Sequence, residues 1–185
     1  MVKYTVHSAK TVLRTQVFNV TQERVVIPAG VEVETQLVRH RGAAVIMARK
    51  AQGQVLLIRQ FRLPLRRDSW ELPAGVVDKK ETPLRAAKRE LREETGYRAR
   101  SWAKLVECFP SPEFCDEKVS AYLARQLTLG EAAPDPYDKI ETRWFTWKEA
   151  VGMPRRGRIR DAKTMLALLH VEQFGVSQSA VPGDE

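Results

Sequence analysis

Residues 75–97 read GVVDKKETPLRAAKRELREETGY and carry the clearest structural signals in the chain. Thr82 is a residue type that caps helix N-termini, and Pro83 suits the first helical position. Gly96 suits the left-handed residue that follows the end of a helix. The stretch therefore predicts a helix over residues 83–95, with a loop on either side.

Three glutamates gather beside the expected buried face of this helix. At about 100° per residue, a narrow apolar stripe is formed by Leu84, Ala87 and Leu91. Glu90 and Glu94 lie one above the other beside this stripe, and Glu93 is next to them. Carboxylates this close repel one another and need a cation, for which Mg²⁺ or Mn²⁺ is chemically suited. Arg89 and Arg92 are expected to point elsewhere on the helix. A solvated acidic face with i,i+4 salt bridges has the same spacing, which leaves both interpretations open.

The whole stretch resembles the Nudix box of the Nudix hydrolase family, GX5EX7REUXEEXGU, where U is aliphatic. Gly75 is followed after five residues by Glu81, and seven further residues lead to REL at 89–91, then EE at 93–94 and Gly96. The one departure is Tyr97, where an aliphatic residue is usual. Seven fixed letters match by chance on the order of once in a million chains of this length.

The resemblance implies a Nudix fold of the α+β class: an α/β/α sandwich, with a small N-terminal antiparallel sheet in addition. The implied ligands of Mg²⁺ or Mn²⁺ are Glu90, Glu93, Glu94 and the main-chain carbonyl of Ala74. Arg89 would orient the glutamates, Glu81 would support the loop, and Gly75 and Gly96 are the structural glycines of the box. Bound cations suit hydrolysis of a pyrophosphate, because they neutralise its charge and lower the pKa of a bound water towards neutrality.

Two flanking segments, GQVLLIRQFR (53–62) and SWELPAG (69–75), resemble the ADP-ribose pyrophosphatase branch of this family. Pro112, about 15 residues past the box, and GRIRDAKTMLALL (157–169) are similar to that branch as well. The resemblance implies hydrolysis of ADP-ribose to AMP and ribose 5-phosphate. Glu113 stands where the branch often has glycine, so another nucleotide-sugar or dinucleotide pyrophosphatase, acting on GDP-mannose or NADH, remains an alternative.

The branch also implies further site residues. Arg62 and Glu71 are the expected substrate contacts, although such a pair can also serve structure alone. Glu117 matches an acidic position that contacts metal or the terminal ribose. The general base of the branch comes from a later mobile loop, here residues 130–144, in which Glu141 is the first candidate and Asp138 the second. With Glu93 and Arg89, Glu141 completes the expected catalytic set.

The chain divides into three parts by pattern. Residues 1–39 contain the strand-like runs 12–18, 21–27 and 31–39, with a turn at Pro28-Ala29-Gly30, and form the small sheet. Such a sheet needs a surface to pack on, and the resemblance implies a homodimer in which it takes part. Residues 40–175 form the Nudix domain, and 176–185 a flexible tail. Within the domain we expect strands at 42–48, 54–61, 102–109, 117–125 and 144–147, and a second helix over 161–174 capped by Asp161.

Composition limits the partners. The hydrophobic and charged fractions of 43% and 29% are ordinary for a globular protein, and no apolar run approaches a membrane span. The N-terminal segment has no secretory pattern, so we expect a cytoplasmic protein without a membrane partner.

The net charge of +8 suggests an anionic partner. The densest cluster of positive charge consists of Arg155, Arg156, Arg158 and Arg160. A solvated basic face is the favoured interpretation of this cluster over a nucleic-acid site. The other alternative is a non-catalytic, basic Nudix module that binds RNA or another anionic ligand. The complete set of box glutamates argues against it.

Overall fold

The centre of the protein is β4 (Ala43–Ala48), in which all six residues are buried. The structure, a computed structural model, describes residues 4–133 and 139–176. β4 pairs in parallel with β9 (Val119–Leu129) and antiparallel with β7 (Ala74–Val76). β8 (Tyr97–Cys108) follows β9, so the strand order of this mixed sheet is β7-β4-β9-β8. A strand that is buried along its whole length must be covered on both faces of its sheet, as the apolar run predicted.

A second sheet, of order β10-β5-β6, is antiparallel throughout. It consists of β5 (Gln54–Arg62), β6 (Arg67–Glu71) and β10 (Glu141–Thr146). The short 3-10 helix η1 (Leu63–Leu65) connects β5 to β6. This sheet carries the segments 53–62 and 69–75 and thereby places them beside the box.

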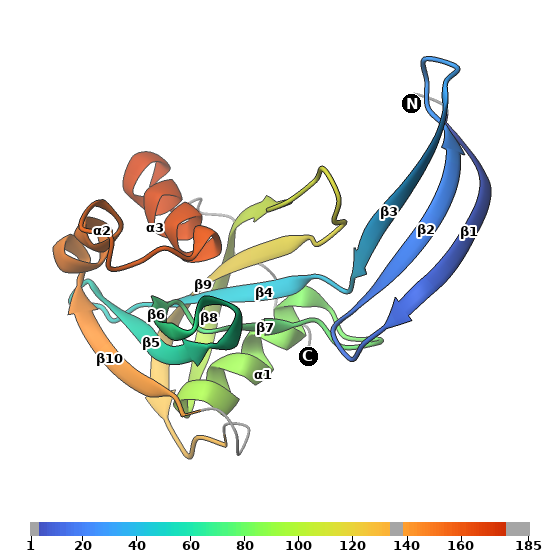
Figure 1. Ribbon diagram of the computed structural model, residues 1–185. Coiled ribbons are helices and arrows are strands. Elements are labelled where there is room, and N and C mark those ends of the chain that lie inside the picture. Colours follow the sequence, from blue (N-terminus) through green and yellow to red (C-terminus); the bar gives the residue numbers. More distant parts are fainter. Residues whose placement is uncertain (1–3, 134–138, 177–185) are drawn as a thin grey trace.

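Helices cover the sheets from two sides (Figure 1). α1 (Pro83–Thr95) packs on one side against β4, β7 and β8, while α2 (Trp147–Arg155) and α3 (Ala162–Phe174) lie on the other. The expected α/β/α sandwich of the α+β class is confirmed. No helix within the described ranges is long and apolar enough to cross a membrane.

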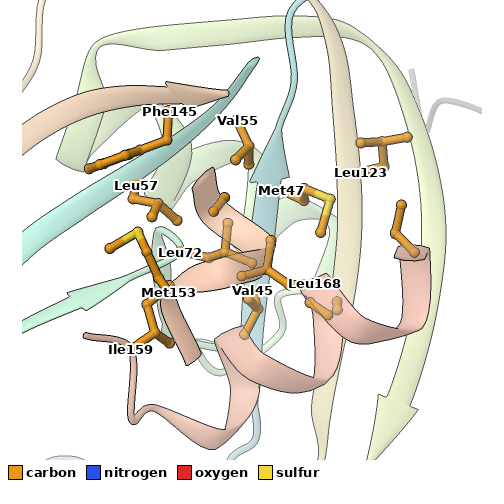
Figure 2. Close-up of a cluster of buried hydrophobic side chains, with 14 of the residues drawn as sticks. Val45, Met47, Val55, Leu57, Leu72, Leu123, Phe145, Met153, Ile159 and Leu168 are labelled. Atoms are coloured by element: carbon orange, nitrogen blue, oxygen red, sulfur yellow. The ribbon is translucent and has the colours of Figure 1, made fainter. Parts of the chain in front are cut away.

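Alternation along β4 divides the core into two halves. Val45 and Met47 face α3 and join a cluster that also includes Leu57, Leu72, Phe145, Met153, Ile159 and Leu168 (Figure 2). Ala44 and Ile46 face α1, where they meet the predicted stripe of Leu84, Ala87 and Leu91. The helix that carries the glutamates is therefore fixed to the central strand along its buried face.

The N-terminal segment forms a three-stranded antiparallel sheet that extends away from the helices (Figure 1). Its strands are β1 (Thr5–Arg14), β2 (Phe18–Val26) and β3 (Glu32–His40). The prediction of one strand over 12–18 is wrong, because the Thr15 hydroxyl bonds to both main-chain groups of Phe18 and closes a turn there. The predicted turn at 28–30 is confirmed, since Gly30 has φ 77° and donates to Ile27 O at 2.9 Å.

The other differences lie at the ends of elements and at α2. β8 and β9 cover 97–108 and 119–129, in place of the predicted 102–109 and 117–125. The predicted strand at 144–147 is β10, but Trp147 already begins α2, which the hydrophobic pattern did not predict. Thr146 and Glu149 form a capping box that starts this helix. That capping box is a local signal that was present in the sequence.

Candidate active site

The box folds as strand, loop and helix, and its helix has the predicted bounds. Thr82 caps α1 by accepting from Arg85 N at 3.3 Å, and Gly96 ends it in the left-handed region at φ 74°. A side chain at position 96 would also meet Gly130 O at 2.7 Å, so the close approach of the next loop requires glycine there. Both ends of the helix are thus fixed by local signals.

Arg89 lies at the centre of the acidic cluster. Its guanidinium donates two hydrogen bonds to Glu81, at 3.1 and 3.0 Å, and a third to Val76 O at 3.0 Å. It also contacts the carboxylates of Glu90 and Glu93, the latter at 3.2 Å. The prediction that Arg89 points away from the glutamates is wrong, since its long side chain folds back across the helix surface to reach them. These contacts, above all those with Glu81, raise the pKa of Arg89.

Arg92, the other arginine expected to point elsewhere, also contacts this cluster. Its guanidinium donates to Glu93 Oε1 at 2.8 Å, although its side chain is 45% exposed. Glu93 is therefore held between two arginines.

Glu90 is the most desolvated of the carboxylates around Arg89. Burial raises the pKa of Glu90 above its usual value, and the neighbouring Arg89 opposes this shift. The side chain occupies the space that a Cβ at position 75 would fill, because such an atom would lie 1.9 Å from Glu90 Oε1. Gly75 is therefore required by the placement of Glu90 and not by a positive φ. This gives the first glycine of the box a direct physical reason.

Glu94 connects the helix to the strand before the box. Its Oε2 accepts a hydrogen bond of 3.1 Å from Ala74 N, on β7. The residue whose carbonyl is the expected main-chain ligand is therefore joined through its N–H to a carboxylate of the same set. Carboxylate and carbonyl oxygens suit a hard divalent cation as ligands. One of these carboxylates, that of Glu90, fits only because residue 75 has no side chain. As they stand, no three acidic, His or Cys side chains in the described ranges are grouped closely enough to hold an ion, and Glu90 and Glu93 are held by Arg89.

Arg62 and Glu71 form a paired site on the neighbouring sheet. Two hydrogen bonds of 3.1 and 2.6 Å join them, and the Glu71 side chain is only 4% exposed. The Glu71 carboxylate is the main cause of the raised pKa of Arg62, while the charges of Asp161 and Glu94 contribute less. The charge of Arg62 therefore interacts with that of one box glutamate, Glu94.

The remaining candidates have other neighbours. The carboxylate of Glu117 lies 4.0 Å from His40 Nδ1, and its main-chain N–H donates to Cys115 Sγ. Glu141 begins β10, is more than half exposed, and lies 3.6 Å from Arg59 on β5. The observed partner of Glu141 is thus a residue outside the box. Asp138 lies outside the described residues.

Asp161 is a site neighbour that the sequence did not indicate as such. It caps α3 as predicted, accepting from Thr164 N at 2.9 Å and from the Thr164 hydroxyl at 2.7 Å. That hydroxyl accepts in turn from Leu72 N at 2.9 Å, which links the start of α3 to the segment before the box. Burial alone would raise the pKa of Asp161, but Lys163 and Thr164 outweigh it and hold that pKa below its usual value. Its charge acts on Arg62, so the start of α3 borders the site.

Comparisons with known proteins agree with this geometry. A family model described as "NUDIX domain" matches residues 38–168. The chain is 34% identical to an "ADP-ribose pyrophosphatase" of Bacillus subtilis (strain 168), over 88% of this chain and 92% of the relative. It is 34% identical to an "ADP-ribose pyrophosphatase" of Mycobacterium tuberculosis (89% and 81%), and 33% identical to a "GDP-mannose pyrophosphatase" of Cronobacter sakazakii (75% and 76%). A solved structure titled "Crystal structure of ADP compounds hydrolase" superposes with a TM-score of 0.79 at 21% identity, covering 92% of both chains.

The chain therefore belongs to the NUDIX family, and the solved structure shows the same fold. With all of its box glutamates present and its helix in place, it is a Nudix hydrolase. Hydrolases of this family generally use divalent metal ions.

Proposed function

We propose that the protein hydrolyses the pyrophosphate bond of ADP-ribose to give AMP and ribose 5-phosphate. The observation that carries this proposal is Arg62, which two hydrogen bonds to the buried Glu71 hold in place and whose charge interacts with that of Glu94. A cationic group beside the carboxylates that receive the metal is what an anionic diphosphate requires. The ADP-ribose pyrophosphatases that match over almost nine-tenths of this chain support the choice of substrate.

Glu90, Glu93, Glu94 and the Ala74 carbonyl are the proposed ligands of Mg²⁺ or Mn²⁺. When bound, the cation supplies neutralisation of the pyrophosphate charge and activation of water. Arg89 can release the carboxylates of Glu90 and Glu93 without losing its place, because its two hydrogen bonds to Glu81 and the one to Val76 remain. In this proposal Arg89 positions the ligands, and its anchor is Glu81.

The chain's other residues receive the following roles. Arg62 binds the diphosphate, and Glu71 holds its guanidinium in a bidentate geometry. Glu117 contacts the metal or the terminal ribose. Glu141 is the proposed general base, with Asp138 as second candidate. The ion pair with Arg59 has to open for Glu141 to act, because a base must come within hydrogen-bond reach of the attacking water.

A panel of substrates tests the proposal. The panel contains ADP-ribose, GDP-mannose, NADH, diadenosine polyphosphates and nucleoside triphosphates, each with and without Mg²⁺, and the products are identified chromatographically. Release of AMP and ribose 5-phosphate from ADP-ribose, with the highest kcat/KM of the panel, is expected. GDP-mannose is the second candidate, because the GDP-mannose pyrophosphatases match over three-quarters of this chain. A higher kcat/KM for GDP-mannose would replace the proposed substrate and keep the chemistry.

We also propose a homodimer in which the β1–β3 sheet takes part. This sheet exposes Val6, Val12 and Leu13, and Val31 is exposed just before β3, each at 45% or more. A small sheet with apolar residues on its surface gains stability by packing on another surface, and a second copy of the chain provides one. Light scattering coupled to size-exclusion chromatography is expected to give twice the mass of 21.1 kDa. A mass of one chain at micromolar concentration would reject the dimer. The cytoplasmic location, and the expectation that neither membrane nor nucleic acid is a partner, stay predictions.

A further inference from the structure

A small basic pocket lies beside the Arg62–Glu71 pair. Its volume is about 80 Å³, and it is lined by Arg67 and Ser69 of β6 and by Arg158 and Arg160 of the loop between α2 and α3. This small, open hollow suits a group of phosphate size.

The pocket adjoins the proposed substrate contacts on two sides. Arg67 is the β6 partner of Arg62 in the strand register, so the two side chains arise from directly opposed positions. Arg160 precedes Asp161, whose charge reaches Arg62. A ligand that contacts Arg62 therefore has part of its structure close to the pocket.

The charge of the pocket is strongly positive. It contains one acidic residue, Asp68, which is paired with Arg59 at 2.7 Å. Among the ion pairs between described residues, none involves Arg67, Arg158 or Arg160. Three guanidinium groups around one small hollow repel one another, and an anion placed between them removes that repulsion.

The loop that carries Arg158 and Arg160 has a fixed conformation. Gly157 has φ 67°, which a glycine adopts without strain, and its N–H donates to Pro154 O at 2.9 Å. Ile159 is 1% exposed and fixes the loop to the core, so Arg158 and Arg160, on either side of it, are directed outward. Arg160 Nε also donates to Gly157 O at 3.3 Å. The Arg160 guanidinium is thereby held in place, and such a donor loses less entropy on binding an anion than a free side chain does.

We propose that this pocket binds a phosphate of the substrate other than its pyrophosphate. The preferred substrate would then be a nucleoside diphosphate derivative that also carries a phosphomonoester. This inference rests on the proposed function and narrows its substrate class. The phosphomonoester has two possible sources, the ribose of the nucleoside and the distal sugar, which share the same chemistry.

Three substrates distinguish these sources: ADP-ribose, ADP-ribose with a 2′-phosphate on the adenosine, and ADP-ribose with a phosphate on the distal ribose. With Mg²⁺ present, kcat/KM for at least one phosphorylated compound is expected to exceed that for ADP-ribose by about tenfold or more, as charge-assisted hydrogen bonds allow. The compound that shows the excess identifies the source. The excess should shrink as salt is raised from 50 to 500 mM, since partly exposed charges are screened.

Arginine variants connect the excess to the pocket. Arg158→Gln and Arg160→Gln are each expected to lower the ratio of kcat/KM for phosphorylated to unphosphorylated substrate by about tenfold. Arg155→Gln is the matched control, because Arg155 belongs to the same basic cluster but does not line the pocket. A ratio near one in the wild type, or a ratio unchanged in both pocket variants, would overturn the inference.

Binding to the Glu94→Gln protein separates this inference from the proposed function. Calorimetry with the same three compounds measures affinity without turnover. If ADP-ribose is hydrolysed and phosphorylated compounds are neither cleaved faster nor bound more tightly, the pocket assignment fails while the proposed function stands. If nothing is hydrolysed by the wild type, the proposed function fails. The pocket assignment then still holds if a phosphorylated compound binds about tenfold more tightly in an Arg158-dependent manner, and it fails otherwise.

Discussion

Replacing Gly75 by alanine tests whether the placement of Glu90 determines activity. The new Cβ would lie 1.9 Å from Glu90 Oε1, 2.0 Å from Cδ and 2.6 Å from Cγ. Ordinary contact begins at 3.4 Å, so the carboxylate has to retreat by about 1.5 Å. Misplacement of a reacting group by about 1 Å can cost roughly 100-fold in rate. We therefore expect kcat/KM to fall about 100-fold, equivalent to about 2.7 kcal/mol of transition-state stabilisation.

The fold should survive this substitution, because the clash is with a flexible side chain and Gly75 is not among the residues with positive φ. AMP release at saturating Mg²⁺ measures the activity, and thermal unfolding measures the stability. Gly152→Ala, on α2, is the matched control. Its Cβ would also meet a flexible side chain, at 2.6 Å from Arg156 Nη1. The control should keep full activity. A folded Gly75→Ala protein with activity within threefold of the wild type would refute the reasoning.

Three further substitutions test other parts of the site. Arg89→Lys removes the bidentate contact with Glu81. We expect the free energy of unfolding, measured in urea, to fall by about 2 kcal/mol, and kcat to fall as well. An unchanged unfolding midpoint would contradict the anchoring role of Arg89. Asp161→Ala should cost about 1 kcal/mol at pH 7. The folded pKa of Asp161 is lowered, so its charge stabilises the fold above the unfolded pKa of about 3.9, and this part is lost as pH falls through the folded pKa. Urea unfolding of both proteins should show the gap shrinking below about pH 4, and a constant gap would exclude the charge as its cause. Glu141→Gln should lower kcat at least about 100-fold, with little change in the Mg²⁺ concentration that gives half the maximal rate. The control is Glu107→Gln, because Glu107 is a surface glutamate paired with Lys104. An unchanged rate in Glu141→Gln removes Glu141 from the mechanism.

The box helix was predictable to the residue because its signals are local. A cap at Thr82, a proline at the first position and a glycine after Thr95 each act within one turn, and α1 has these bounds. The position of Arg89 was not predictable from the helical wheel. The wheel gives the direction in which a side chain leaves the helix, whereas a long arginine ends wherever its hydrogen bonds take it.

The rest of the site depends on contacts between distant segments. The charge of Arg62 reaches that of Glu94 because β5 and β6 pair beside the box. For Arg62 and Glu71, only the family resemblance implied a substrate-binding role. The basic pocket joins Arg67 to Arg158, residues that meet only through packing of the α2–α3 loop on β6. No spacing in the sequence encodes that contact. The cluster at 155–160 therefore resembled a solvated face, and only part of it lines a pocket.

The release of AMP from ADP-ribose by the wild type and by Glu94→Gln, each with Mg²⁺ and after chelation, tests the central claim most directly. The account predicts release by the wild type that stops on chelation and returns with added Mg²⁺. It also predicts at least about a 100-fold lower rate in the variant, because one carboxylate that is bonded to the Ala74 peptide is lost. Equal rates in the two proteins, or release that persists after chelation, would contradict a reaction carried out at the box glutamates.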